Sequence, residues 1–193
     1  MREHVESLRR LRACIEAIRW AESQPDAETA WRRCPRGDWL LWVAARLDID
    51  RKRLVRAACA CARTALSHVP AGEERPRIAI ETAEAWARGE ATLDDVRRAV
   101  QAASAAVFAA NAAYAAFGAV AFAADAYAAA AAYAANAANA AYAAFAAASA
   151  AFAAAYAAAA ADATRSASLA RSAEIVREII PWEAMAVAIE ARS

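Results

Sequence analysis

The feature that most constrains the fold of this chain is a tract, from about residue 93 to 164, in which most residues are alanine. Alanine is the strongest helix former, and its propensity summed over such a length favours helix throughout. A single straight helix of this length would extend roughly 90 Å at 1.5 Å per residue, too long for a compact chain. We therefore expect several helices here, with Gly118 and the asparagines as candidate breaks.

Larger side chains mark one helical face of this tract. They step by three and four residues, as in a coiled coil, and are Tyr142, Phe145, Ser149, Phe152 and Tyr156. Alanine elsewhere lets helix axes approach to the short end of the usual range of roughly 8–10 Å. We predict a tight antiparallel helix stack, whose long apolar face is covered by the N-terminal helices, by its own hairpin or by another subunit.

The tract does not have the composition of a membrane span. Residues 104–161 contain no Leu or Ile, and Asp125 and several asparagines interrupt them. Leu, Ile, Phe and Val are the residues that usually drive insertion. The net charge is +1, and no Lys/Arg stripe with interleaved aromatic residues is present. We expect neither a membrane nor a nucleic acid as partner.

The remaining sequence predicts a series of amphipathic helices, because apolar residues recur at steps of three and four. We expect helices over 3–23, over a short segment around Trp31, and over 38–47, 50–69, 76–88, 165–180 and 182–193. Asp26 and Asp38 are the predicted N-caps, Asp48 and Asp50 together mark the start of the helix over 50–69, and Gly89 is a predicted C-cap. Thr92 and Asp95 form a variant capping box, so that another helix begins near Leu93.

We therefore predict an all-α protein, a multi-helix bundle or helical stack with a close-packed alanine-rich C-terminal half. Residues 1–193 are expected to form a single helical domain. Its parts are the amphipathic helices of 1–92, the alanine-rich helices of 93–164 and the C-terminal helices of 165–193.

The four cysteines lie in separate segments, and the opening residues are too charged for a secretory signal. This pattern favours a reducing cytoplasm. Cys59 and Cys61 are two residues apart in a predicted helix, where their side chains point about 200° apart and cannot hold one metal ion together. We expect them to be buried thiols.

The inventory for catalysis is small. His4 and His68 are the only histidines, and neither has an evident nucleophile beside it in sequence. No phosphate-binding glycine loop, HExxH or CxxC motif is present, so nothing supports a cofactor or a metal. We expect a non-enzymatic protein, and an enzyme with a buried His or Cys centre is the less favoured alternative.

The most distinctive segment is the Trp- and Arg-rich run over residues 31–42. Such a density of Trp and Arg is typical of an interaction hot spot. The competing interpretation is that the tryptophans fill a core that is otherwise short of volume, while Asp38 caps a helix and Arg36 pairs with a carboxylate. The candidate partner-binding residues are Arg33, Arg36, Asp38 and Trp39.

Three stretches, at residues 30–42, 70–77 and 80–86, together resemble a family of immunity proteins assigned to bacterial polymorphic toxin systems. Members commonly have an alanine-rich C-terminal half. The resemblance covers roughly residues 14–100, and its most specific part is the GDWLLW run at 37–42.

This resemblance implies a cytoplasmic protein that binds a cognate toxin and blocks it. It names a class of protein and assigns no role to individual residues. The alternative from a different class is a self-assembling scaffold protein, in which the alanine-rich helices form a homomeric interface.

Overall fold

The computed structural model describes residues 3–64, 66, 72–113 and 162–192, and all regular structure in these ranges is helical, with no strand. This confirms the predicted all-α class. The helices are α1 (Glu3–Arg10), α2 (Ile15–Glu22), α3 (Ala27–Arg33), α4 (Gly37–Arg46), α5 (Arg51–Arg63), α6 (Arg75–Arg88), α7 (Leu93–Ala113), α10 (Asp162–Ile179) and α11 (Trp182–Glu190).

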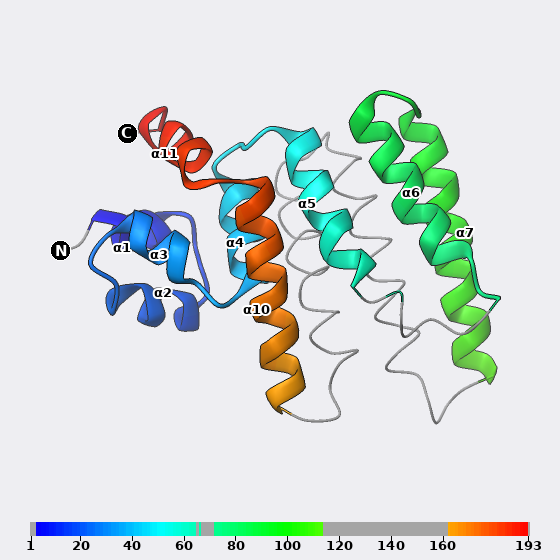
Figure 1. Ribbon diagram of the computed structural model, residues 1–193, viewed down its shortest axis with the longest axis horizontal. Coiled ribbons are helices and arrows are strands. Elements are labelled where there is room, and N and C mark those ends of the chain that lie inside the picture. The colour runs from blue at the N-terminus through cyan, green and yellow to red at the C-terminus, as the bar shows by residue number, and fades with distance from the viewer. Residues whose placement is uncertain (1–2, 65, 67–71, 114–161, 193) are drawn as a thin grey trace.

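The helices form a row across the molecule (Figure 1). Helices α4, α10 and α5 lie in the middle, α6 and α7 lie at one end, and α1, α2, α3 and α11 lie at the other. Helix α10 packs against both α4 and α5, although α6, α7 and the alanine tract separate them in sequence. The two ends of the chain therefore meet around the Trp- and Arg-rich segment.

A continuous apolar core connects α3 to α11. Its largest fully buried side chains are Leu41, Val55, Ile80, Val96, Val176, Ile180 and Met185. Burial of one such side chain contributes roughly 1.5–3 kcal/mol. Four residues of the segment at 165–180 recur at steps of three and four and are all buried, namely Leu169, Ala173, Val176 and Ile180.

The two thiols of the predicted buried pair lie in this core on α5. Cys59 and Cys61 are both fully buried. The Sγ of Cys59 lies 3.9 Å from the carbonyl oxygen of Ile80, and the Sγ of Cys61 lies 3.8 Å from that of Ser172. Burial raises the pKa of Cys61 to about 12 and also raises the pKa of Cys59. The prediction of buried thiols is confirmed.

The predicted single helix over residues 3–23 is wrong. Helix α1 ends at Arg10, and Arg12 takes a left-handed conformation with φ of 62° before α2 begins at Ile15. The break lets α2 fold back against α1, and an ion pair with an N–O distance of 2.6 Å joins Arg9 to Glu22. No glycine or proline marks this break, so the apolar spacing continues through it.

Most of the predicted caps are confirmed. Asp26 accepts the backbone N–H of Thr29 at 2.7 Å. Of the two aspartates that mark the start of α5, Asp50 is the cap, and it accepts the backbone N–H of Arg53 at 2.9 Å. Gly89 ends α6 with φ of 87°, a left-handed conformation that glycine adopts without the steric cost of a Cβ.

The capping box before α7 also forms. The Asp95 carboxylate accepts the backbone N–H of Thr92 at 2.8 Å, and the Thr92 hydroxyl accepts that of Asp95 at 3.2 Å. These reciprocal bonds satisfy donors that have no partner within the helix, which fixes its start near Leu93.

Two predictions about helix extent have different outcomes. Helix α5 ends at Arg63, before the expected end near Val69. The aromatic stripe from Tyr142 to Tyr156 and the candidate break at Gly118 lie outside the described residues, so the predicted stack stays a prediction.

Within the described ranges, no helix is both long enough and apolar enough to cross a membrane.

Candidate partner-binding site

The Trp- and Arg-rich segment spans the end of α3, a short turn and the start of α4. Trp31 is buried in α3, whereas Trp39 and Trp42 in α4 are half-buried. Trp39 lies beside Trp20 of α2, with ring centroids 6.2 Å apart and the rings tilted by 56°. This tilted arrangement is one that aromatic pairs favour. The segment therefore contributes to the core and also reaches the surface.

Arg36 and Asp38 form a two-bond ion pair at the start of α4. Arg36 Nε lies 2.8 Å from one Asp38 carboxylate oxygen, and Arg36 Nη2 lies 2.5 Å from the other. These hydrogen bonds raise the pKa of Arg36 above its ordinary value. The guanidinium also lies 4.5 Å from the centroid of the Trp39 ring, within cation–π range. Three of the four candidate partner-binding residues thus contact one another.

Asp38 is not the N-cap of α4, so this prediction is wrong. The helix begins at Gly37, one residue before the predicted cap, and the cap position is taken by Arg36 without a side-chain hydrogen bond. Asp38 lies in the first turn, where a negative charge is favourable near the positive end of the helix dipole. Its carboxylate pairs with Arg36, as the competing interpretation of the segment expected for Arg36.

The turn before α4 is fixed to α10. Arg177 Nη1 donates to the Cys34 carbonyl oxygen at 2.7 Å, and the Cys34 thiol donates weakly to the Arg36 carbonyl oxygen at 3.6 Å. Burial raises the pKa of Cys34 to about 12. The thiol is thus neutral at ordinary pH and serves packing rather than reactivity.

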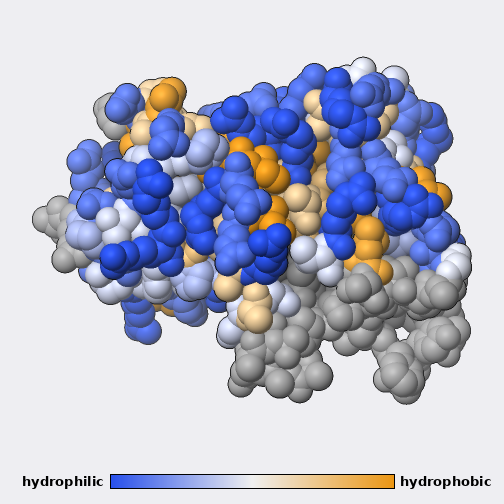
Figure 2. Space-filling view, in the orientation of Figure 1, coloured by the Kyte–Doolittle hydropathy of each residue, from blue (hydrophilic) through white to orange (hydrophobic). Residues whose placement is uncertain are grey.

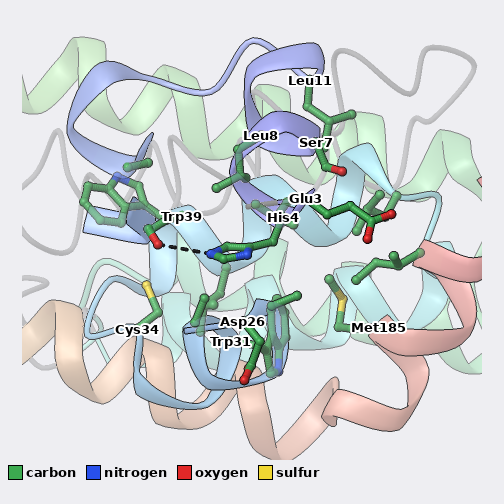
Figure 3. Close-up of a pocket in the computed structure, with 18 of the residues that line it drawn as sticks. Glu3, His4, Ser7, Leu8, Leu11, Asp26, Trp31, Cys34, Trp39 and Met185 are labelled. Carbon is green, nitrogen blue, oxygen red and sulfur yellow. Dashed lines mark hydrogen bonds between the residues drawn. The ribbon is translucent and has the colours of Figure 1, made fainter. Parts of the chain in front are cut away.

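A cavity of about 610 Å³ opens beside this segment, between α1, α2, α3, α4 and α11. Four residues of the segment line it, and they are Trp31, Cys34, Trp39 and Leu40. Figure 3 shows the cavity with side chains from both ends of the chain around it, among them Leu8 of α1 and Met185 of α11. Its lining is mainly apolar and aromatic, which is typical of ligand and anchor pockets.

His4 of α1 lies among the side chains that surround this cavity (Figure 3). Its Nε2 lies 3.1 Å from the carbonyl oxygen of Ala21. A carbonyl oxygen only accepts hydrogen bonds, so Nε2 must carry the proton of this contact. When the ring is neutral, Nδ1 is therefore its hydrogen-bond acceptor.

The charged residues that line the cavity balance one another. Glu3 and Asp26 supply two carboxylates, and Arg10 and Arg192 supply two guanidinium groups. Asp26 also caps α3, while Arg192 pairs with Asp48. The cavity therefore offers no excess of one sign to select an ionic ligand.

The four predicted partner-binding residues have different environments. Arg33 is exposed at the end of α3, Arg36 and Trp39 are half-exposed, and Asp38 is only 6% exposed. Of the four, Trp39 alone lines the cavity. A direct contact with a partner is thus open to Arg33, Arg36 and Trp39, whereas Asp38 positions Arg36.

The interpretation of the sequence did not identify His4 and α11 as contributors to the cavity. The cavity requires α1 and α11, from opposite ends of the sequence, to meet around α3 and α4. The spacing of apolar residues within one segment does not indicate that these distant helices pack together. The concentration of Trp20, Trp31, Trp39 and Trp182 around one hollow could have been suspected only from the unusual number of tryptophans.

Three buried polar atoms have no hydrogen-bond partner in the part of the chain that the structure describes. They are Trp31 Nε1, Arg46 Nε and the Ser172 hydroxyl. The Arg46 guanidinium lies 5.4 Å from the Trp42 ring centroid, and this cation–π contact compensates in part for the hydrogen bond that Nε lacks.

Across the described ranges, no group of three or more His, Cys, Asp or Glu side chains is arranged to hold a metal ion.

Comparison with known proteins gives no assignment of this site. No protein-family model, no curated protein and no solved structure matches the chain.

Proposed function

We propose that this chain is a non-enzymatic binding protein of the immunity type, which acts in the bacterial cytoplasm by binding a cognate toxin and blocking it. The cavity beside the Trp- and Arg-rich segment is the proposed contact site. The toxin contributes a side chain that enters the cavity, and neighbouring parts of its surface contact Arg33 and Arg36.

One observation supports this proposal more than any other. The GDWLLW run at 37–42, on which the resemblance to immunity proteins is most specific, lines the cavity through Trp39 and Leu40, and Trp31 and Cys34 of the same Trp- and Arg-rich segment also line it. Tryptophans and arginines around a hollow are typical of interface hot spots. If these residues only filled the core, close packing would leave little empty volume beside them.

The exposed large apolar side chains give no comparable support to self-assembly. Among the described residues they are Ile15, Ile78, Leu93 and Val187, and each lies on a different helix. Single exposed apolar residues are normal on protein surfaces. The homomeric interface expected in the alanine tract falls mostly outside the described residues, so light scattering of the purified chain is its test.

The proposed function predicts that a toxin gene lies beside this gene, and the product of that gene is the probe for the test. Co-expression should restore growth of a bacterial host that carries the toxin, and the two purified proteins should form a 1:1 complex in size-exclusion chromatography with light scattering. Failure of both, with a toxin shown to be active, would overturn the proposal.

A cavity-filling variant locates the contact. Ala30 lines the cavity, so Ala30→Phe should fill part of it and weaken toxin binding at least tenfold. Ala167→Phe is the matched control, because Ala167 is exposed on α10 and does not line the cavity. Circular dichroism and thermal unfolding of both variants show whether the fold is retained. Equal binding by both folded variants would place the contact elsewhere.

A further inference from the structure

We infer that the cavity beside α3 and α4 is a receptor for an aromatic side chain that carries a hydrogen-bond donor, namely a tyrosine or tryptophan of the bound protein. This inference deepens the proposed function and rests on it. It assigns the acceptor role to Nδ1 of His4.

The first step is the orientation of the His4 ring. Its contact with the Ala21 carbonyl oxygen, at 3.1 Å, fixes the proton of the neutral ring on Nε2. That carbonyl also accepts the backbone N–H of Gln24 at 3.0 Å, so it does not depend on His4 for its own hydrogen bond. The His4 contact therefore orients the ring and leaves Nδ1 as an acceptor among the side chains of the cavity (Figure 3).

The second step is the character of the walls. Four tryptophans line the cavity, together with Leu40 and Met185, and they are Trp20, Trp31, Trp39 and Trp182. Aromatic rings pair favourably with one another in tilted or offset geometries. The thioether of a methionine also makes favourable contacts with the edges of aromatic rings. These walls favour a flat aromatic ring over a flexible aliphatic chain.

The third step is the balance of charge and size. The two acidic and two basic residues of the lining cancel, so a neutral group is preferred to an ion. The volume of about 610 Å³ lies within the range of roughly 300–1,000 Å³ that is typical of ligand pockets. It exceeds the volume of one aromatic ring, so the backbone around the inserted residue has space as well.

A hydrogen-bond acceptor in such a pocket distinguishes tyrosine from phenylalanine. Phenylalanine leaves Nδ1 without a donor, and a buried polar group without a partner is unfavourable. The tyrosine hydroxyl and the tryptophan indole N–H are both donors. Both residues are also frequent as hot-spot anchors in protein interfaces.

The test uses N-acetyl-tyrosinamide and N-acetyl-phenylalaninamide as probes for the full chain. Affinity is measured by NMR titration, since small ligands of this kind bind with dissociation constants on the order of 1 mM. We expect the tyrosine amide to bind about tenfold more tightly, as one hydrogen bond allows. Shifts in the signals of His4 and Ala21 locate the binding. Equal affinities, or shifts elsewhere, overturn the inference.

Two variants separate the role of the acceptor from that of the ring. His4→Phe keeps a ring and removes the acceptor, so the preference for the tyrosine amide should disappear. His4→Gln keeps an acceptor and a donor, so part of the preference should return. The inference is wrong if His4→Phe discriminates between the amides as the unmodified chain does.

The proposed function and this inference fail in different ways. A toxin complex whose affinity is unchanged by His4→Phe would remove the inference and leave the immunity function. A tyrosine preference that depends on His4, in a chain that binds no toxin, would remove the function and leave the aromatic receptor.

Discussion

Gly37 and Ser172 lie so close together that a Cβ atom on Gly37 would be 2.5 Å from the Cβ of Ser172. The same atom would be 2.6 Å from the Ser172 carbonyl carbon and 2.7 Å from the Ala173 backbone nitrogen. Gly37 is the first residue of α4, and Ser172 lies within α10. The absence of a side chain at Gly37 therefore sets how closely these two helices approach.

We expect Gly37→Ala to lower the free energy of unfolding by about 2 kcal/mol, because overpacking a core contact typically costs roughly 1–3 kcal/mol. The gain from replacing a helical glycine, about 1 kcal/mol or less, is too small to offset this. Urea unfolding measures the change. Adding Ser172→Gly to Gly37→Ala should restore only part of the lost stability, because the close contacts with the backbone of Ser172 and Ala173 remain. Unchanged or increased stability of Gly37→Ala would contradict the close approach.

The ion pairs Arg36–Asp38 and Arg63–Glu84 have the same two-bond geometry in different surroundings. In the second pair, Nε and Nη2 of Arg63 lie 2.7 Å and 2.6 Å from the two Glu84 oxygens. The Asp38 side chain is 8% exposed, whereas that of Glu84 is 21% exposed. The two arginines therefore offer a matched comparison of a more buried and a less buried carboxylate.

We expect Arg36→Met to cost about 2–3 kcal/mol of stability, because it leaves the buried Asp38 carboxylate without its partner. Arg63→Met should cost about 1 kcal/mol or less, because water reaches Glu84. Denaturant unfolding of the two variants under the same conditions gives both values. Equal losses would show that the burial of Asp38 does not control the strength of its pair.

The buried thiols predict a loss of stability at alkaline pH. Burial raises the pKa of Cys34 and Cys61 to about 12 and also raises that of Cys59, whereas an unfolded thiol ionises near about pH 8.5. The folded state therefore holds its thiol protons at a pH where the unfolded state releases them. The stabilisation that these buried thiols contribute is fully present below about pH 8.5 and is lost as the pH rises towards 12.

By pH 9.5 we expect each of these thiols to lower the free energy of unfolding by about 1.4 kcal/mol relative to neutral pH. Urea unfolding at pH 7.5 and 9.5, in the presence of a reductant, measures the difference. Cys61→Ala removes one thiol and should reduce the pH-dependent loss by that amount, whatever its effect at neutral pH. An identical pH dependence in the variant would argue against the burial of Cys61.

The left-handed conformation of Arg12 predicts that Arg12→Gly stabilises the chain. A left-handed conformation costs a residue with a Cβ roughly 1–2 kcal/mol, which glycine avoids, although glycine loses more entropy on folding. We expect a net gain of about 0.5–1 kcal/mol in thermal or urea unfolding. Glu6→Gly, at an exposed position in the interior of α1, is the matched control and should lose about 1 kcal/mol. Loss of stability in both variants would mean that Arg12 is not in this conformation.

The features that could be predicted from the sequence are those that depend on residues close together in the chain. Asp26, Asp50, Gly89 and the Thr92–Asp95 box act within one helical turn, so their roles could be predicted from neighbouring residues. The break at Arg12 could not be predicted, because packing between α1 and α2 overrides a helical pattern that continues through it.

The candidate site could not be predicted in full, because it depends on contacts between helices that are even farther apart in sequence. The tryptophans of the segment at 31–42 were recognised as distinctive, but whether they were core or surface depended on helices far away in sequence. Met185 of α11 and His4 of α1 complete the cavity, and their local sequences do not indicate a shared site. The role of Gly37 likewise depends on Ser172.

The position of α10 between α4 and α5 determines when this chain can complete its fold during synthesis. Until α10 leaves the ribosome, the apolar faces of Leu41 and Val55 lack Val176 and Ile180, with which they share the core. Contacts this distant in sequence slow folding and prolong the exposure of apolar surface. The apolar surface of these helices therefore stays exposed for most of translation, which favours aggregation of the nascent chain.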